Sequence, residues 1–251
     1  MFQEESGKLK WVQAKVYVDG DRAPTVYKPR PLSYAMRKKV EEELQKLEQD
    51  QVTEPVKYSD WAAPIVPVLK PNGQVRICGD YKVTVNKASK LEHYPVPTLE
   101  DLITKSGKGS VYHKLDLSHE CSQTELEPET RKFVMINTDK GLFQYKLLPY
   151  GVSSAPAQFH RITESLLQGI PSTVVYFDDI LVTGDTAAES YHNLDQVLER
   201  LDKAGARLKK KCTFGAEVVF PDHKINRFRI NHWMRKWRLW FKQNRQKTSS
   251  S

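Results

Sequence analysis

The spacing of apolar and polar residues divides the chain into helical and extended segments. After Ser33, apolar residues recur at helical intervals among charged ones, at Met36, Val40, Leu44 and Leu47. This spacing predicts an amphipathic helix with Ser33 as its N-cap. Residues 189–204 repeat the pattern and predict a second helix. A third helix is expected after residues 153–154, because Pro156 fits the first turn of a helix and apolar residues follow at helical spacing.

A β-hairpin is predicted over residues 63–78. Residues 63–69 and 74–78 are mostly apolar, and Pro71-Asn72-Gly73 separates them. Asn-Gly between two apolar runs is a strong hairpin signal, since both residues tolerate positive φ. Two basic residues, Lys70 and Arg76, flank this turn.

Further apolar or β-branched runs predict four more strands, at residues 111–117, 143–148, 173–177 and 180–183. The last two runs meet at Asp178-Asp179, which places two carboxylates at the tip of a hairpin. Asp116 stands near the end of the first run. Hairpins followed by helices indicate a mixed α+β fold.

These three acidic residues are candidate metal ligands. Neighbouring strands of one sheet could bring Asp116, Asp178 and Asp179 together. Clustered carboxylates repel each other unless cations neutralise them, and their hard oxygen atoms suit magnesium. The alternative interpretation of Asp178-Asp179, taken by itself, is a polar turn without a ligand.

Composition narrows the class of protein. The 251 residues are 39% hydrophobic and 28% charged, which is typical of a folded chain, and the formal net charge of +8 favours a polyanionic partner. The three cysteines are widely spaced and suggest neither a disulfide framework nor a zinc site. The longest apolar stretches have the length of strands and the first residues lack a secretory pattern, so we expect an intracellular protein, cytoplasmic or nuclear, without a membrane partner.

Five motifs in order carry a family resemblance. They are Trp61-Ala62-Ala63-Pro64, Val75-Arg76-Ile77-Cys78-Gly79-Asp80-Tyr81, Lys114-Leu115-Asp116-Leu117, Leu148-Pro149-Tyr150-Gly151 with the following residues to Phe159, and Tyr176-Phe177-Asp178-Asp179-Ile180-Leu181-Val182. Between about Arg30 and Asn226 the chain resembles the reverse transcriptases of gypsy-type retrotransposon Pol polyproteins. A Tyr-x-Asp-Asp motif alone would be weak evidence, but five ordered motifs are specific.

The resemblance implies an α+β architecture of fingers and palm, with an antiparallel palm sheet packed on helices. Asp116, Asp178 and Asp179 would be the catalytic residues and would bind two Mg²⁺ ions, with Mn²⁺ as the alternative. The reaction would join a deoxynucleoside triphosphate (dNTP) to a primer 3′-hydroxyl on an RNA or DNA template. The oligomeric state is left open.

The same resemblance supplies candidate substrate-binding residues. Lys70 and Arg76 match a fingers hairpin that grips the triphosphate, although both could instead belong to a solvated hairpin. Tyr150 and Gly151 match a loop under the incoming nucleotide, where glycine lets the backbone approach closely. Lys211 matches a lysine near the leaving pyrophosphate, or else residues 209–211 form a solvated face.

Several positions depart from the family pattern. Cys121 stands where relatives carry an aromatic residue that excludes a ribose 2′-hydroxyl, and Gln123, from the same motif, completes the predicted substrate-binding set. Glu120 would bring a negative charge close to bound phosphates, and Pro221 replaces part of a turn that positions the primer. These changes leave three alternatives open: an active polymerase domain, an inactive retroelement remnant that at most binds nucleic acid, or a gene product without any function.

The predicted organisation has three parts. Residues 1–30 form an extended leader, residues 31–225 form the fingers and palm, and residues 226–251 form a basic, tryptophan-rich tail. We expect the thumb to be absent, because the likeness ends near residue 226. The tail has three interpretations: translated non-homologous sequence, a nucleic-acid-binding arm or an amphipathic membrane-surface helix.

Overall fold

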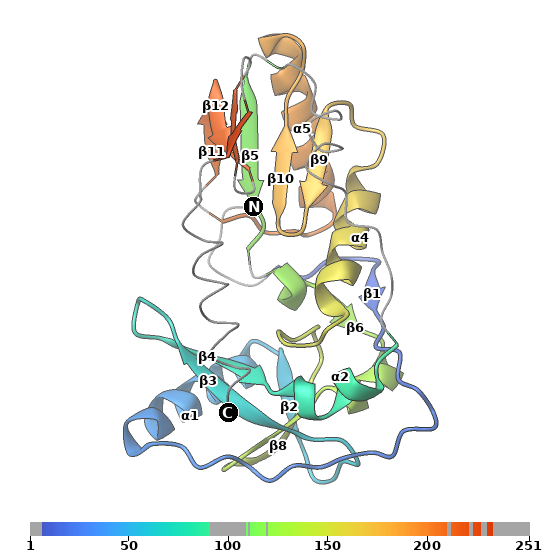
Figure 1. Ribbon diagram of the computed structural model, residues 1–251, viewed down its shortest axis with the longest axis vertical. Coiled ribbons are helices and arrows are strands. Elements are labelled where there is room, and N and C mark those ends of the chain that lie inside the picture. The colour runs from blue at the N-terminus through green and yellow to red at the C-terminus, as the bar shows by residue number, and fades with distance from the viewer. Residues whose placement is uncertain are drawn as a thin grey trace.

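The computed structural model describes residues 7–90, 109, 111–118, 120–209, 212–220, 223–226 and 230–232. Two sheets with their helices lie at opposite ends of the molecule (Figure 1). A five-stranded sheet in the order β2-β8-β7-β3-β4 forms the lower end, and a four-stranded sheet in the order β11-β5-β10-β9 forms the upper end.

The five-stranded sheet is mixed, since β3 pairs parallel with β7 and its other pairs are antiparallel. Its strands are β2 (Thr53–Val56), β3 (Ala63–Leu69), β4 (Val75–Gly79), β7 (Met135–Thr138) and β8 (Gly141–Tyr145). Helix α1 (Tyr34–Gln49) packs against it through buried Val40 and Leu44. The predicted amphipathic helix is confirmed, with Ser33 at its N-cap, but the Ser33 side chain makes no capping hydrogen bond.

The predicted hairpin is confirmed as β3 and β4, which pair up to Leu69 and Val75. The turn between them closes through the Lys70 N–H, which donates to the Gln74 carbonyl oxygen (2.8 Å). Gly73 adopts a φ of 82°, a conformation that glycine reaches without strain.

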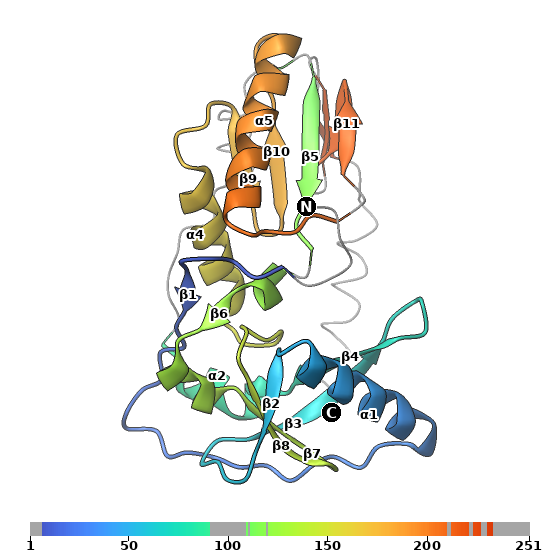
Figure 2. The same cartoon turned by 180° about the vertical axis from the view of Figure 1, so that it is seen from behind.

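The four-stranded sheet is antiparallel throughout. Its strands are β5 (Tyr112–Asp116), β9 (Thr173–Tyr176), β10 (Asp179–Val182) and β11 (Thr213–Gly215). Helices α4 (Ala155–Leu167) and α5 (Ala187–Lys203) cover one face, as Figure 2 shows from behind. Leu115 and Ile180 belong to the main core, while Tyr112 and Leu181 join a second cluster with Val218 and Phe220. Because both faces are buried, β10 has a continuous apolar run instead of alternation.

The two helices begin as local sequence chemistry requires. Helix α4 has Pro156 in its first turn, where a missing N–H costs nothing. Helix α5 begins with a reciprocal cap, in which the Glu189 N–H donates to Thr186 Oγ1 (3.2 Å) and the Asp185 N–H donates to Glu189 Oε2 (3.0 Å). Gly205, with a φ of 77°, follows the end of α5.

Short elements connect the two sheets. They are β1 (Gln13–Ala14), β6 (Glu125–Leu126), α2 (Val85–Ala88) and three 3₁₀ turns over Tyr81–Val83, Glu120–Gln123 and Pro128–Phe133. Beyond them lie β12 (Glu217–Val219), β13 (His223–Asn226) and β14 (Ile230–His232), which form a separate three-stranded sheet. The remainder of the predicted tail lies outside the described residues.

The N-terminal segment, residues 7–30, contacts both ends of the molecule. Near the four-stranded sheet, the Lys10 N–H donates to the Ala204 carbonyl oxygen (2.9 Å). Strand β1 then pairs parallel with β6, and Val26 forms a bridge with Ala62 at the start of the five-stranded sheet. The predicted division at residue 30 stays a prediction. Within the described ranges, no helix has the length and apolar character needed to cross a membrane.

Candidate active site

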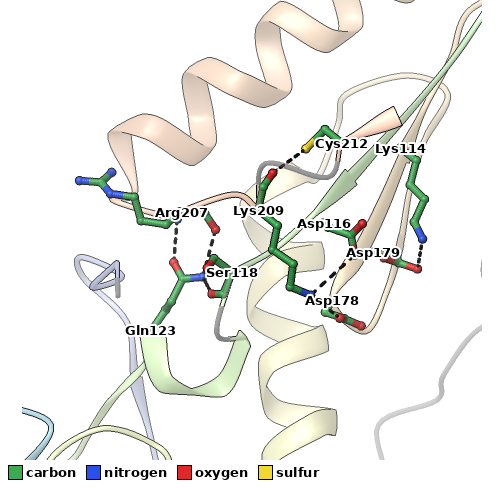
Figure 3. A network of polar contacts seen from close by, with 9 residues as sticks. All are labelled: Lys114, Asp116, Ser118, Gln123, Asp178, Asp179, Arg207, Lys209 and Cys212. Atoms are coloured by element: carbon green, nitrogen blue, oxygen red, sulfur yellow. Dashed lines mark hydrogen bonds and ion pairs between the residues drawn. The ribbon is translucent and has the colours of Figure 1, made fainter. Parts of the chain in front are cut away.

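Strand pairing brings the three predicted acidic residues together. Asp116 at the end of β5 is the register partner of Asp179 at the start of β10. The Leu117 N–H donates to the Asp178 carbonyl oxygen (2.9 Å), which holds the end of β5 against the turn that carries Asp178. One oxygen from each carboxylate lies within 4.8 Å of the other two. The expected convergence is therefore observed (Figure 3), and the role of these residues as ligands stays a prediction.

The hairpin tip between β9 and β10 is a strained two-residue turn. Tyr176 pairs with Asp179, so only Phe177 and Asp178 form the turn. Phe177 has a φ of 53°, a conformation that costs a residue other than glycine on the order of 1–3 kcal/mol. The Phe177 N–H donates to Nδ1 of buried His160 on α4 (3.1 Å). His160 belongs to none of the candidate sites predicted from the sequence.

Two lysines neutralise part of the carboxylate charge. Lys114 Nζ lies 2.9 Å from Asp179 Oδ2. Lys209 Nζ lies 3.7 Å from Asp116 Oδ1 and 3.4 Å from Asp178 Oδ2. The Lys209 N–H also donates to the Asp116 carbonyl oxygen (2.8 Å), so the backbone fixes this lysine beside the acids. When all three carboxylates are ionised, the two ammonium groups neutralise only part of their charge. The cluster is then still negative and can attract a cation.

Burial changes the titration of one member of the cluster. The side chain of Asp179 is 14% exposed, and burial raises its pKa from 3.8 to about 7. A hydrogen bond with Asp116 raises the pKa further, whereas Lys114 lowers it. Burial disfavours the ionised form of this carboxyl, so Asp179 holds its proton to higher pH than an exposed aspartate does.

The cluster fits a divalent cation. Its donors are hard carboxylate oxygens from three side chains, all partly exposed and therefore within reach of solvent. A bound cation would favour the ionised form of Asp179 and so oppose the effect of burial, which raises the pKa of this carboxyl. These three residues could therefore hold a divalent metal.

A second group of predicted residues meets where β4 ends. The Arg76 guanidinium carbon lies 4.7 Å from the centroid of the Tyr150 ring, within range of a cation–π interaction. Gly151 has a φ of 97°, and a Cβ at this position would lie 2.9 Å from the Gly79 carbonyl oxygen. Arg76, Tyr150 and Gly151 are thus brought together, and glycine is required for the close approach of the two backbones.

Asn86 fastens this loop. Its Nδ2 donates to the Gly151 carbonyl oxygen (2.8 Å), and its Oδ1 accepts from the Ser153 N–H (2.9 Å). Lys70 lies further out, at the turn of the same hairpin that carries Arg76. The substrate-binding roles of Lys70, Arg76, Tyr150 and Gly151 stay predictions.

Gln123 lies inside the protein and has no exposed surface. Its Oε1 accepts from the Arg207 N–H (2.7 Å), while its Nε2 donates to the carbonyl oxygens of Ser118 and Arg207. Figure 3 shows this amide joining the segment after β5 to the segment that leads to Lys209. Its observed partners are backbone groups, so Gln123 positions Asp116 and Lys209, and its predicted contact with substrate is untested.

The remaining predicted residues lie outside the described residues. These are Lys211 and Pro221, together with the side chains of Glu120 and Cys121. Sequence reasoning chose Lys211 from the three consecutive lysines, whereas the structure places Lys209 against the carboxylates. Lys209 is held there because its neighbour Leu208 forms an isolated β-bridge with Leu117.

Comparisons with known proteins give a consistent family. The family described as "Reverse transcriptase (RNA-dependent DNA polymerase)" matches residues 68–248. An uncharacterized protein of Caenorhabditis elegans, K02A2.6, is 34% identical over 222 residues, covering 87% of this chain and 17% of the relative. The Pol polyprotein from transposon 297 of Drosophila melanogaster is 26% identical over 254 residues, covering 88% of this chain and 24% of the relative. The chain thus spans less than a quarter of either relative.

Solved structures agree on the fold. The foamy viral protease-reverse transcriptase in complex with double-stranded DNA has a TM-score of 0.83 at 21% identity, covering 96% of this chain and 43% of the other. The same viral enzyme in complex with an RNA/DNA hybrid has a TM-score of 0.82 at 22% identity and covers 96% of this chain and 33% of the other. The predicted α+β fold of fingers and palm is confirmed, with the five-stranded sheet as fingers and the four-stranded sheet as palm.

Two details of the sequence interpretation are not decided by these matches. The gypsy subtype stays a prediction. The matched range runs past residue 226 into the segment predicted to be non-homologous, so that boundary also stays a prediction. Transposon Pol polyproteins are among the relatives. Because the family match covers well over half of the chain, this chain belongs to the reverse transcriptase (RNA-dependent DNA polymerase) family.

Proposed function

We propose that the domain is an RNA-directed DNA polymerase that uses two magnesium ions. The observation that carries the proposal is the convergence of Asp116, Asp178 and Asp179, with ligand oxygens within 4.8 Å of one another. Paired cations in such a cluster suit in-line displacement at phosphorus, because they act on both the attacking and the leaving oxygen.

The three aspartates would hold the ions, and Lys114 and Lys209 would limit the charge of the cluster. Bound magnesium would activate the primer 3′-hydroxyl and neutralise charge on the leaving pyrophosphate. The 3′-hydroxyl would lose its proton to solvent, and its oxygen would form a bond to the α-phosphorus of the dNTP as the bond from that phosphorus to the bridging oxygen of the leaving pyrophosphate breaks.

The fingers would hold the nucleotide. The guanidinium of Arg76 presents a planar set of donors that suits phosphate oxygens, and its contact with Tyr150 orients it. Gly151 would let the backbone lie close to the new base pair. Lys70, further along the hairpin, would add a second cation toward the triphosphate.

The proposed partners are a dNTP and a primer paired to an RNA or DNA template. The net charge of +8 supports a polyanionic partner, and two similar solved proteins were determined with double-stranded DNA and with an RNA/DNA hybrid. An intracellular location, cytoplasmic or nuclear, is part of the same proposal.

The test is primer extension by the purified chain on an RNA template with Mg²⁺. We expect Mg²⁺-dependent product, and Asp178→Asn should lower the rate at least about a thousandfold by removing a ligand. Asp195→Asn is the matched control, because Asp195 is an exposed carboxylate on α5. Salt-sensitive nucleic-acid binding without any extension would instead support an inactive remnant.

A further inference from the structure

The turn that carries Asp178 has a backbone conformation that its sequence disfavours. Two-residue hairpin turns with positive φ usually contain Gly, Asn or Asp at the strained position. Here the position is occupied by Phe177 at a φ of 53°. A bulky side chain provides no local stabilisation of this conformation, so a contact from outside the hairpin must hold it.

His160 provides that contact. It lies on α4, is fully buried, and accepts the Phe177 N–H through Nδ1 at 3.1 Å. Its ring also packs against the Phe177 ring, with centroids 5.8 Å apart. Because Nδ1 accepts a hydrogen bond, the proton of the neutral ring is on Nε2, the nitrogen that lies 3.9 Å from Glu164 Oε2.

Helix α4 is a firm support for this contact. Two residues before His160, the buried Gln158 amide accepts from the Lys15 N–H (3.1 Å) and donates to the Lys15 carbonyl oxygen (2.8 Å). The helix therefore cannot slide relative to the N-terminal segment without breaking both bonds. A fixed imidazole in turn fixes the Phe177 N–H, one residue before Asp178.

We propose that His160 is a positioning residue that holds the Phe177–Asp178 turn so that the Asp178 carboxylate faces Asp116. It acts through the backbone of Phe177 and touches neither metal nor substrate. The inference rests on the proposed function, in which the three carboxylates must be arranged to bind cations. It goes beyond that function by assigning a task to a residue outside the cluster.

The test compares His160→Leu with His160→Asn in the full chain. The two replacements have nearly the same shape, but only Asn keeps an acceptor atom bonded to Cγ, where Nδ1 stands. We expect His160→Leu to weaken Mg²⁺ binding, measured by calorimetry, about tenfold, the usual scale for one lost hydrogen bond. His160→Asn should stay within about twofold of the unaltered chain.

A second readout reports on the turn directly. In the unaltered chain, the amide hydrogen of Phe177 should exchange slowly with solvent, and His160→Leu should accelerate that exchange at least about tenfold. Where extension is measurable, His160→Leu should lower kcat and leave the KM for dNTP unchanged, because the fingers are not altered.

A double variant separates positioning from general packing. Phe177→Gly removes the conformational strain of the turn, so His160→Leu should cost less than about threefold in Mg²⁺ affinity when combined with it. Equal losses in both backgrounds would mean that His160 only fills space, and would overturn the proposal.

Other outcomes are also decisive. A folded His160→Leu variant that binds Mg²⁺ as tightly as the unaltered chain contradicts the proposal. If that variant does not fold, rapid exchange of the Phe177 amide in the unaltered chain, or a tenfold loss of Mg²⁺ affinity in His160→Asn, contradicts it instead. An unaltered chain that binds Mg²⁺ but extends no primer refutes the proposed polymerase activity and leaves the role of His160 intact. If the chain binds no Mg²⁺, the proposed function fails and amide exchange alone decides the role of His160.

Discussion

The palm carries its functional charges in a compact, partly buried cluster, whereas the fingers carry theirs on an exposed hairpin. At the palm tip, Asp179 and Lys114 have side chains that are 14% and 17% exposed, and backbone hydrogen bonds fix their strands. On the fingers, Arg76 is exposed and its described contact is with the Tyr150 ring. The palm therefore has a geometry set before any ligand arrives, while the fingers offer a cation that can adjust to one. Changes in the palm should alter kcat and metal binding, and changes in the fingers should alter KM.

Among the changes that test this comparison, the largest effect is expected at the junction of the two regions. Gly151→Ala would place a Cβ 2.9 Å from the Gly79 carbonyl oxygen at a φ of 97°. We expect kcat/KM for primer extension to fall about a hundredfold, since a displacement of about 1 Å near the reacting groups has that scale. Gly169→Ala is the matched control, because Gly169 has a φ of 84° but open space around it. Equal losses in both variants would show that strain, and not the contact with Gly79, is responsible.

The pH dependence of stability should distinguish the palm cluster from an ordinary set of surface acids. Burial raises the Asp179 pKa from 3.8 to about 7, so between about pH 4 and pH 7 the folded chain holds a proton that the unfolded chain releases. The contribution of Asp179 to the free energy of unfolding therefore falls as pH rises through this window, by on the order of 2 kcal/mol.

Urea unfolding without divalent ions at pH 5 and pH 8 measures this effect. Raising the pH from 5 to 8 should lower the free energy of unfolding of the unaltered chain relative to that of Asp179→Asn. Saturating Mg²⁺ at pH 8 should restore the stability of the unaltered chain relative to the variant. Parallel pH profiles for the two chains would contradict the raised pKa.

In the fingers, Arg76→Lys should raise the KM for dNTP about tenfold with little change in kcat. Lysine keeps the charge but loses the planar set of donors and the stacking on Tyr150. Arg37→Lys is the control, because Arg37 is exposed on α1. A drop in kcat with constant KM would show that Arg76 acts on the chemical step, as the palm residues are expected to, and not on dNTP binding. Steady-state kinetics at varied dNTP concentration measure kcat and KM separately.

The smallest effect is expected from Lys209→Met. Removing an ammonium group 3.4 Å from Asp178 and 3.7 Å from Asp116 should tighten Mg²⁺ binding about threefold, a modest change because Lys209 is partly exposed and screened by solvent. Calorimetric titration measures it, with Lys203→Met as the control, since Lys203 is exposed at the end of α5 and pairs with Glu199. Weaker binding in Lys209→Met would show that the lysine supports the cation and does not compete with it.

Local patterns predicted much of the architecture. The periodicity after Ser33 gave α1, Asn72-Gly73 gave the hairpin turn, and the acidic tip placed Asp178 beside the end of β5. These features are decided by residues close in sequence, or by strands whose apolar faces fix their register.

Contacts between distant segments could not be predicted in the same way. The Gln123 amide bonds to the backbone of Arg207, 84 residues away in the sequence, a contact that the motif around Gln123 does not indicate. In the sequence, Lys209 is one of three consecutive lysines with nothing to distinguish it. Its position is set by the bridge that the preceding residue, Leu208, forms. His160 gave no signal in the sequence, because its importance depends on the φ of Phe177. Each of these cases requires tertiary packing that one sequence does not reveal.

The path of the N-terminal segment limits how fingers and palm can move relative to each other. It is bonded to Ala204 at the palm and to Ala62 at the fingers, and the Gln158 amide grips it in between. A segment that is hydrogen-bonded at both ends acts as a tether and limits how far the two halves can separate. Shortening the chain to begin at residue 31 would release that tether, and the gap between fingers and palm would then be free to widen.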